Sequence, residues 1–172
     1  MTVPNVLFSA EQIQVRVRAL AREIASAPLV PDICMPVLVG GFIFAADLLR
    51  ALSWEGVAMD VEMIWLRSYG DKRVAGAISM IAGPSEQIAG RHVLVIDGVL
   101  DAGRTIAKAM SLIKAAGAAS VQVAAMLDKQ RPDAVAKADY VGFAVGNEFV
   151  VGYGMDDAGR HRGLGYIGKV SG

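Results

Sequence analysis

The stretch VLVIDGVLDAGRT, residues 93–105, joins an apolar run to two carboxylates and a glycine-containing turn. The apolar residues 93–96 predict a buried strand, and apolar residues at helical spacing predict a helix over 104–116. Asp97 and Asp101 therefore fall where a strand ends and a helix begins. In an open α/β sheet this is the edge at which ligands bind.

Working outward, the chain alternates between the strand and helix patterns. An amphipathic helix is predicted over 9–26, with Ser9 and Gln12 as a capping box, and a second helix follows the Gly-Gly pair at 40–41. Further strands are predicted in CMPVLV (34–39), VAMDVEMIWL (57–66), VAGAISMIAG (74–83), SVQVAAMLD (120–128), DYVGFAV (139–145) and EFVVGYG (148–154). The pattern predicts an α/β fold: a single domain over 1–172 with a mainly parallel central sheet flanked by helices.

Composition narrows the possible classes of protein. The chain has 172 residues, one cysteine (Cys34) and a formal net charge of zero with both signs interspersed. This balance gives no electrostatic footprint for nucleic acid or for an anionic membrane. The chain contains no apolar run long enough for a membrane span and shows no export signal at its start, so we expect a cytoplasmic protein.

The turn at 102–105 has the properties of an anion site. Backbone N–H groups at a helix N-terminus and the helix dipole both favour a phosphate, and Gly103 allows a ligand to approach the backbone closely. The carboxylates beside it suit sugar hydroxyls, a metal ion or a proton to be removed. A phosphorylated sugar satisfies both halves of the site, although the same two acids could also do no more than cap the helix.

Several motifs in order resemble the type I phosphoribosyltransferases, and among them the hypoxanthine-guanine enzymes. The opening stretch is similar to their phosphoribosyl diphosphate motif, and VLVGGFIFAADLLR (37–50) to their first loop and the helix after it. LRSYG (66–70) resembles their lid segment, and LDK (127–129) resembles the segment that carries their purine-selecting lysine. ADYVGFAVGNEFVVGYGMDDAGRHRGLGYIG (138–168) resembles nearly the whole of their C-terminal region.

The resemblance implies transfer of a phosphoribosyl group from phosphoribosyl diphosphate to a 6-oxopurine, with Mg²⁺. Asp101 would be the general base near purine N7, and Asp97 would hold the ribose hydroxyls and contribute to the metal site. Lys129 would approach the purine O6, where an ammonium, which only donates, favours an oxo group. The 5′-phosphate would lie on the turn formed by Asp101 with Ala102, Gly103, Arg104 and Thr105.

The other implied contacts come from the C-terminal region. Phe149 would stack on the base while the backbone of Val150 meets its edge. Asp156 would ligate Mg²⁺ and Arg162 would contact the diphosphate. The segment 145–172, with the N-terminal helix, would form a small hood over the site.

The first loop and the lid complete the implied site. Val39 and Gly40 would meet the diphosphate, and a flexible hairpin at 67–73 carrying Ser68 and Tyr69 would close over the reaction. The family also implies a homodimer or homotetramer.

Three positions depart from the family pattern. Gly98 replaces one of the two acids that hold the ribose diol, Ala102 lacks the hydroxyl of the turn, and Val39 stands where a polar residue is usual. These departures predict weaker substrate binding and leave two alternatives open. One is a catalytically weak nucleotide-binding regulatory protein, and the other is a transferase for another oxopurine such as xanthine.

Overall fold

The computed structural model describes residues 4–68 and 78–170. Its elements along the chain are β1 (Asn5–Phe8), α1 (Ala10–Ala25), β2 (Ile33–Leu38), α2 (Phe42–Trp54), β3 (Asp60–Val61), β4 (Ile64–Ser68), β5 (Ile78–Ala82), the 3₁₀ turn η1 (Glu86–Ile88), β6 (His92–Leu100), α3 (Arg104–Ala115), β7 (Ser120–Asp128), β8 (Tyr140–Ala144), β9 (Val150–Val151) and β10 (Ile167–Lys169).

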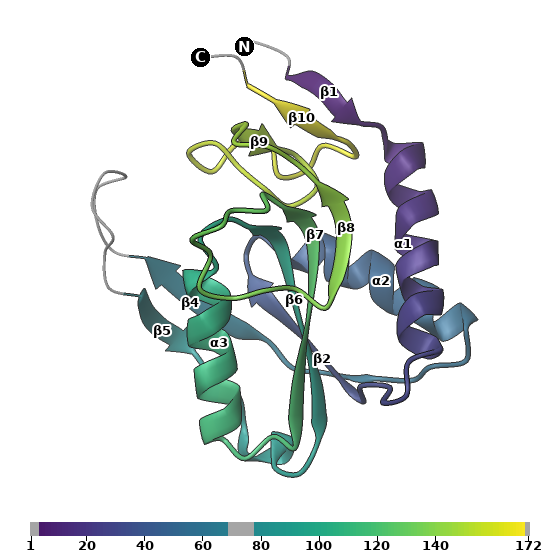
Figure 1. Ribbon diagram of the computed structural model, residues 1–172, viewed down its shortest axis with the longest axis vertical. Helices are drawn as coiled ribbons and strands as arrows, with labels where there is room; N and C mark the ends of the chain where they lie inside the picture. Colours follow the sequence, from purple (N-terminus) through teal and green to yellow (C-terminus); the bar gives the residue numbers. More distant parts are fainter. Residues whose placement is uncertain (1–3, 69–77, 171–172) are drawn as a thin grey trace.

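A seven-stranded sheet forms the centre of the molecule (Figure 1). Its order is β5-β4-β2-β6-β7-β8, with β3 paired beside β2. All pairs are parallel except β4 with β5. The predicted α/β fold with a mainly parallel sheet is confirmed.

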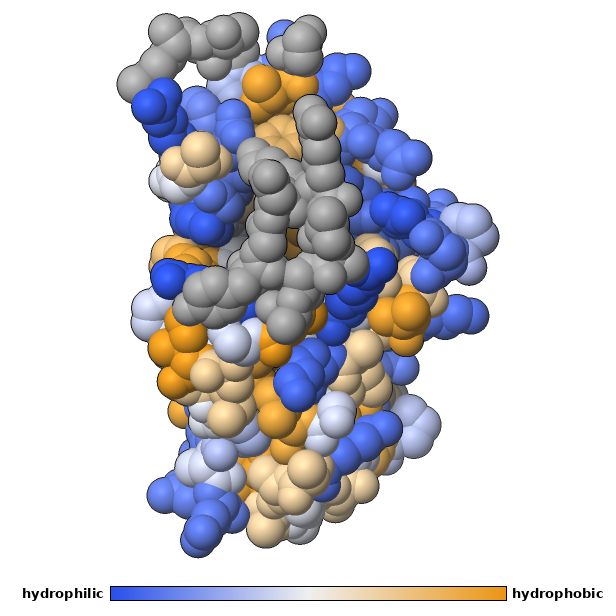
Figure 2. Space-filling model, turned by 90° about the vertical axis from the view of Figure 1, so that its left-hand side faces the viewer, coloured by the Kyte–Doolittle hydropathy of each residue, from blue (hydrophilic) through white to orange (hydrophobic). Residues whose placement is uncertain are grey.

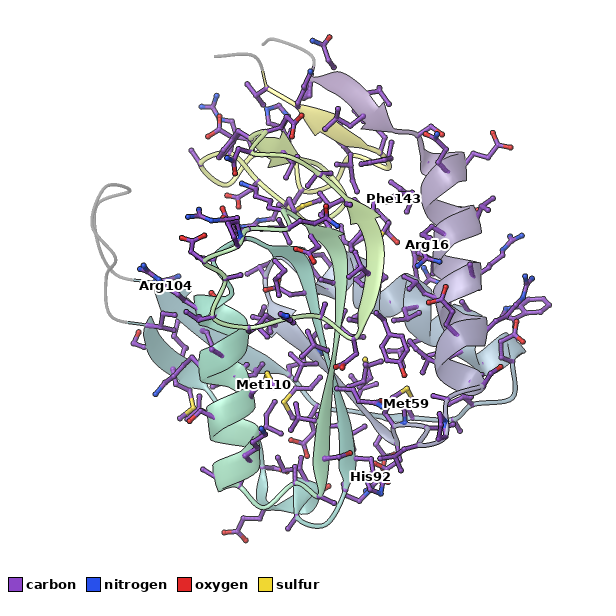
Figure 3. All side chains as sticks on the ribbon, in the orientation of Figure 1. Arg16, Met59, His92, Arg104, Met110 and Phe143 are labelled. Atoms are coloured by element: carbon purple, nitrogen blue, oxygen red, sulfur yellow. The ribbon has the colours of Figure 1, made fainter. Side chains whose placement is uncertain are left out.

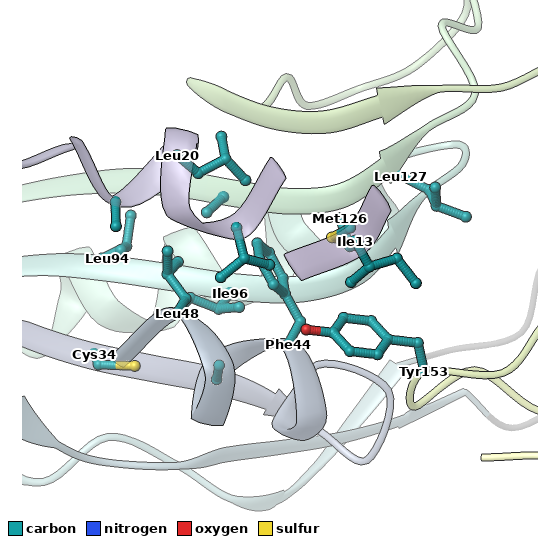
Figure 4. Close-up of a cluster of buried hydrophobic side chains, with 14 of the residues drawn as sticks. Ile13, Leu20, Cys34, Phe44, Leu48, Leu94, Ile96, Met126, Leu127 and Tyr153 are labelled. Carbon is teal, nitrogen blue, oxygen red and sulfur yellow. The ribbon is translucent and has the colours of Figure 1, made fainter. Parts of the chain in front are cut away.

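The sheet is covered on both faces, which explains why its central strands are continuous apolar runs. Helices α1 and α2 pack together on one face, and α3 lies on the other (Figure 1). Figure 4 shows the first of these layers, in which Ile13, Phe44 and Leu48 lie among side chains of the sheet, with Tyr153 from the C-terminal segment at the edge. Cys34 is buried in this layer, and burial raises the pKa of its thiol to about 12.

A second, three-stranded antiparallel sheet, β1-β10-β9, forms a small hood. It lies beyond the carboxyl ends of β6 and β7 (Figure 1). The N-terminal strand of the hood, β1, had no clear pattern in the sequence. Helix α1, which the sequence placed with the hood, buries its apolar side against α2 and the central sheet.

The helix boundaries follow their capping signals. At the start of α1, Gln12 N–H donates to Ser9 Oγ at 3.2 Å, and Ser9 N–H donates to Gln12 Oε1 at 2.8 Å, so the predicted capping box is present. Helix α3 covers Arg104–Ala115 and buries Ile106, Ala109 and Ile113, as predicted.

Two strand predictions in the central sheet were wrong in extent. The single strand predicted over 57–66 is divided into β3 and β4, which keep the same register along β2. Glu62 N–H still donates to the Cys34 carbonyl at 3.0 Å, but Pro36 of β2 has no N–H to continue the ladder. The strand predicted over 93–96 continues to Leu100, since β6 keeps its pairing with β7 beyond its last pairing with β2.

Figure 3 shows Arg104 at the end of the sheet nearer the hood and His92 at the opposite end. Figure 2 shows the side of the molecule on which α3 and β5 lie, where apolar and polar side chains are mixed. Among the described residues no helix is long and apolar enough to cross a membrane.

Candidate active site

Strand β6 carries Asp97 and Gly98 beyond its last pairing with β2. The last β2 partner is Pro36, opposite Ile96, while Asp97 still pairs with Ala125 of β7. Strand β2 itself continues to Leu38 beside β4, and the loop at 39–41 then leads into α2. The two acids of the opening stretch therefore differ in setting: Asp97 lies in the strand, and Asp101 follows it.

The first loop packs against β6 through glycine contacts. A Cβ at Gly98 would lie 2.9 Å from the carbonyl oxygen of Gly40, and a Cβ at Gly154 would overlap the same oxygen. Gly154 comes from the C-terminal segment and has a φ of +100°. Glycines at 98 and 154 therefore allow the first loop, β6 and the C-terminal segment to approach closely around the Gly40 carbonyl.

These contacts explain one departure from the family pattern. Gly98 is buried, and its Cβ direction is occupied by the Gly40 backbone and by Met155 Cγ, which would be 3.3 Å away. The space that an acidic side chain at 98 would take is therefore already occupied in this chain. An acidic side chain at 98 would have to displace the loop that carries Val39 and Gly40.

Asp97 is a poorly solvated carboxyl. Burial raises its pKa to about 7, although a 2.7 Å hydrogen bond donated by Gly98 N–H to its Oδ1 works in the opposite direction. A Cβ at Gly40 would be 3.6 Å from the same oxygen, so the first loop contributes to this burial. Close to neutral pH the group can hold or release a proton.

The turn before α3 is open at the helix N-terminus. Gly103 is the N-cap residue, with a φ of +73°, and no side chain in the described part of the chain caps the helix there. The suggestion that Asp97 and Asp101 merely cap α3 was therefore wrong. Backbone N–H groups and the helix dipole remain directed at this turn, as an anion site requires.

A loop at 129–138 supports the turn from outside. Val135 N–H donates to the Ala102 carbonyl at 3.0 Å, and a Cβ at Gly103 would be 2.7 Å from Ala136 N. Arg104 is exposed and Thr105 is half-buried at the first turn of α3. The structure thus gathers the predicted residues of this turn on one rigid support.

Asp101 is held by two cations. Lys129 Nζ donates to Oδ2 at 3.0 Å, and Arg131 donates to Oδ1 at 3.0 Å. Desolvation raises the pKa of Asp101, but the hydrogen bonds from Lys129 and Arg131 together outweigh it and bring the pKa below its usual value. Sequence reasoning found Asp101 and Lys129 but missed Arg131. This arginine lies two residues after Lys129 and belongs to no motif that the sequence analysis used.

The strand predicted over 148–154 in the hood is much shorter in the structure. Val150 is buried in β9, which covers only Val150–Val151 rather than 148–154, and Phe149 keeps 47% of its surface exposed. The Phe149 carbonyl accepts a 3.2 Å hydrogen bond from Val170 N–H, which fixes this residue to the hood. An exposed aromatic ring on a fixed backbone can offer a flat surface to a planar ligand.

Asp156 and Arg162 lie together in the C-terminal segment. Arg162 donates to Asp156 Oδ1 at 2.7 Å and to the Gly154 carbonyl at 2.6 Å, while Gly159 N–H donates to Asp156 Oδ2 at 2.6 Å. Within residues 4–68 and 78–170 no group of three or more acidic, histidine or cysteine side chains forms a metal cage. A single carboxylate such as Asp156, outside any cage of ligands, matches Mg²⁺. This ion takes one or two protein carboxylates and completes its shell with substrate oxygens and water.

The remaining predicted residues divide by position. Val39 is 39% exposed beside the partly exposed Gly40. Ser68, in the lid predicted over 67–73, ends β4, which pairs antiparallel with β5. Tyr69 and the rest of the predicted lid lie outside the described residues.

Comparison with known proteins agrees with this geometry. Residues 7–158 match the phosphoribosyl transferase domain family. The chain is 35% identical over 175 residues to the hypoxanthine-guanine phosphoribosyltransferase of Bacillus subtilis, covering 98% of this chain and 93% of the relative. It is 39% identical over 173 residues to the bifunctional protein TilS/HprT of Listeria innocua, covering 96% of this chain.

The chain spans 26% of the length of the Listeria relative, so it corresponds to one part of that longer protein. Among solved structures, the hypoxanthine phosphoribosyltransferase of Trypanosoma cruzi is similar, with a TM-score of 0.84 and 32% identity. That match covers 96% of this chain and 95% of the other.

Proposed function

The chain belongs to the phosphoribosyltransferase family, and from that premise we propose that it is a hypoxanthine-guanine phosphoribosyltransferase of purine salvage. It transfers the 5-phosphoribosyl group from phosphoribosyl diphosphate to hypoxanthine or guanine, giving IMP or GMP and diphosphate. The observation that carries this proposal is the contact between Asp101 and Lys129 beside an uncapped helix N-terminus. A base, an oxo-group donor and a phosphate site lie at one edge of the sheet.

In this proposal Asp101 accepts the proton from purine N7 as N9 attacks C1′ of the ribose. A pKa below the usual value keeps Asp101 ionised before the base enters, so the carboxylate can also stabilise positive charge in the ring. Lys129 leaves Asp101 and donates to the purine O6. Its side chain is 13% exposed, so the 6-oxo acceptor would compensate a largely buried charge, whereas the 6-amino group of adenine would not.

The phosphate and sugar are held by the neighbouring elements. Backbone N–H groups of 102–105 bind the 5′-phosphate, with Thr105 adding its hydroxyl, while Ala102 contributes its backbone alone. Asp97 accepts hydrogen bonds from the ribose hydroxyls. Its raised pKa means that a bound cation or the diol has to favour the ionised form.

Mg²⁺ is the cofactor we propose, with Asp156 and Asp97 as the carboxylates that would hold it. When bound it neutralises charge on the diphosphate leaving group. Arg162 then exchanges Asp156 for diphosphate oxygens, which it can bind with two donors.

The base and the diphosphate have further proposed contacts. Phe149 stacks on the base, and the backbone of Val150 meets the edge of the base. Val39 and Gly40 meet the diphosphate. Ser68 and Tyr69 are proposed to belong to the lid.

We further propose that the enzyme works as a homodimer or homotetramer in the cytoplasm. Large apolar side chains stand exposed on α2 and beside it, among them Trp54 at 89%, and a groove of about 580 Å³ lies between α1 and α2. Light scattering of the purified chain at working concentration gives its mass in solution, and a monomeric mass would contradict this part of the proposal.

The test of the function is a spectrophotometric assay with phosphoribosyl diphosphate, Mg²⁺ and each of hypoxanthine, guanine, xanthine and adenine. We expect turnover with hypoxanthine and guanine and none with adenine. Xanthine belongs in the panel because Lys129 reads the substituent at C6 and not the one at C2. Nucleotide binding without turnover of any base would contradict the enzyme and support the regulatory alternative.

A further inference from the structure

Arg131 is the unexpected member of the site. Its guanidinium donates to Asp101 Oδ1 at 3.0 Å and, on its other side, to both oxygens of Asp133 at 2.9 and 2.8 Å. A guanidinium held by a bidentate carboxylate has a fixed plane and direction. Asp133 therefore fixes Arg131, and Arg131 reaches the carboxylate that acts as the base.

The loop that carries Arg131 is itself tied to the site. Lys129 N–H donates to the Leu100 carbonyl at 3.0 Å, which anchors the beginning of the loop to the end of β6. Gln130 has a φ of +50°, and its N–H donates to Asp128 Oδ1 at 2.8 Å. This turn reverses the chain directly after Lys129, so that Lys129 and Arg131 approach Asp101 from the same loop but reach different oxygens.

The two contacts on Asp101 have different roles when a purine binds. Lys129 has to leave Oδ2 to reach the purine O6, whereas nothing in the proposed reaction requires Arg131 to leave Oδ1. Resting on the proposed function, we propose that Arg131 is a positioning residue for Asp101. It holds Oδ1 and so turns Oδ2 toward purine N7 at the moment when Lys129 moves to the base.

Charge supports the same role. Lys129 and Arg131 are the charged side chains that lower the pKa of Asp101 against desolvation, so Arg131 keeps the carboxylate ionised after Lys129 has moved. Asp133 contacts Arg131 and so acts on Asp101 only through it. The hydrogen bond from Arg131 lowers the pKa of Asp133, and the charge of Arg104 in α3 lowers it further by a smaller amount. Arg131 and Asp101 are 37% and 44% exposed, so solvent reduces the size of these effects.

The test compares Arg131→Gln with Arg131→Lys and Asp133→Asn, using Lys114→Gln on the exposed side of α3 as the control. The first measurement is the titration of the Asp101 carboxyl carbon by NMR in the ligand-free protein at low salt. We expect Arg131→Gln to raise the Asp101 pKa by about half a unit to one unit, and Arg131→Lys to raise it less. Lys114→Gln leaves it unchanged.

The second measurement is kcat and KM at pH 7.5. Because the positioned carboxylate serves only the base, Arg131→Gln lowers kcat/KM for hypoxanthine about three- to tenfold and leaves the KM for phosphoribosyl diphosphate within twofold. Arg131→Lys does not restore the rate, since an ammonium cannot span Asp101 and Asp133, and Asp133→Asn shows an intermediate loss.

The outcomes separate this inference from the proposed function. Failure of the wild-type protein to turn over any oxopurine contradicts the function, while the NMR titration still shows whether Arg131 controls Asp101. If the wild type is active and Arg131→Gln matches Lys114→Gln in both measurements, the positioning role is wrong. A lower Tm with equal losses for both substrates and an unchanged Asp101 pKa would likewise overturn it, because Arg131 would then only support the loop.

Discussion

Lys129 Nζ and Asp101 Oδ2 lie 3.0 Å apart at the carboxyl ends of β7 and β6. In the substrate-free site the proposed purine selector and the proposed base thus neutralise each other. The arrangement keeps a largely buried ammonium paired until an oxopurine offers another acceptor, and it keeps the carboxylate ionised until N7 arrives.

Lys129→Met tests the selector. Removing the ammonium deletes a charge-assisted hydrogen bond to O6, so kcat/KM for hypoxanthine should fall by about one to two powers of ten. The preference for hypoxanthine over adenine should shrink with it. Both are measured by initial rates with the two bases at fixed phosphoribosyl diphosphate. Lys137→Met, an exposed lysine in the same loop, is the matched control. Selectivity that survives Lys129→Met would move base recognition to another residue.

Gly98→Ala tests the packing of the first loop. The new Cβ would lie 2.9 Å from the Gly40 carbonyl oxygen, so the loop has to move away from β6. We expect a several-fold higher KM for phosphoribosyl diphosphate and a loss of about 1–3 kcal/mol in stability, read as a lower Tm. Gly165→Ala, where nothing lies within 4 Å of the added carbon, is the control.

Gly98→Asp extends this test to the departure seen in the sequence. If the acid were simply missing, restoring it would lower the KM for phosphoribosyl diphosphate. The structure predicts the opposite, because any side chain at 98 has to push the Gly40 backbone away from β6. A lower KM with an unchanged Tm would show that the first loop has space for the acid after all.

Asp97→Asn tests the cost of burying a carboxyl. Because the folded pKa of about 7 is above the unfolded value, the folded protein binds the extra proton and its stability falls as pH rises from about 4 to 7. Asparagine removes this fall. At pH 8 we expect the variant to be more stable than the wild type by about 2 kcal/mol, or roughly 4–8 °C in Tm, after allowing for the surface that Asp97 keeps exposed.

The comparison of Tm between pH 5 and pH 8, without ligand or divalent cation, measures this effect. The advantage of Asp97→Asn should be present at pH 8 and much smaller at pH 5. An equal Tm difference at both pH values would mean that Asp97 does not titrate in this range. The gain in stability should coincide with a loss of activity, as is common where a polar group is kept for function.

The sequence predicted best where the signal is local. The junction from β6 to α3 combines an apolar run, a glycine turn and helical spacing, and Ser9 with Gln12 marks the start of α1 through contacts three residues apart. Strand β7 was predicted with its observed limits, because its apolar run is long and bounded by polar residues.

The parts that the sequence missed depend on contacts between distant segments. Strands β1, β9 and β10 contain four, two and three residues, too few to show a period, and they form only because they pair with each other. The end of β6 depends on its pairing with β7, which continues to Leu100 opposite Asp128. The restriction at Gly98 is set by Gly40, 58 positions earlier, and is invisible in the local pattern.

The site shows the same division. Asp101 and Lys129 were found because motifs carry them, and the structure brings them into contact although they are 28 positions apart. Arg131 belongs to no motif, and its role follows from a loop whose path is fixed by Gln130 and by bonds to β6. Sequence reasoning could name the chemistry of the site but not the partner that holds the base.

The most direct measurement is turnover of hypoxanthine by the wild type and by Asp101→Asn side by side, with IMP affinity determined for both. The account predicts wild-type turnover, a kcat for Asp101→Asn lower by about 10²- to 10⁴-fold, and IMP dissociation constants within a few-fold of each other. Absence of wild-type turnover despite IMP binding would contradict it. So would an equal loss of kcat and of IMP affinity in Asp101→Asn, because Asp101 would then only bind nucleotide.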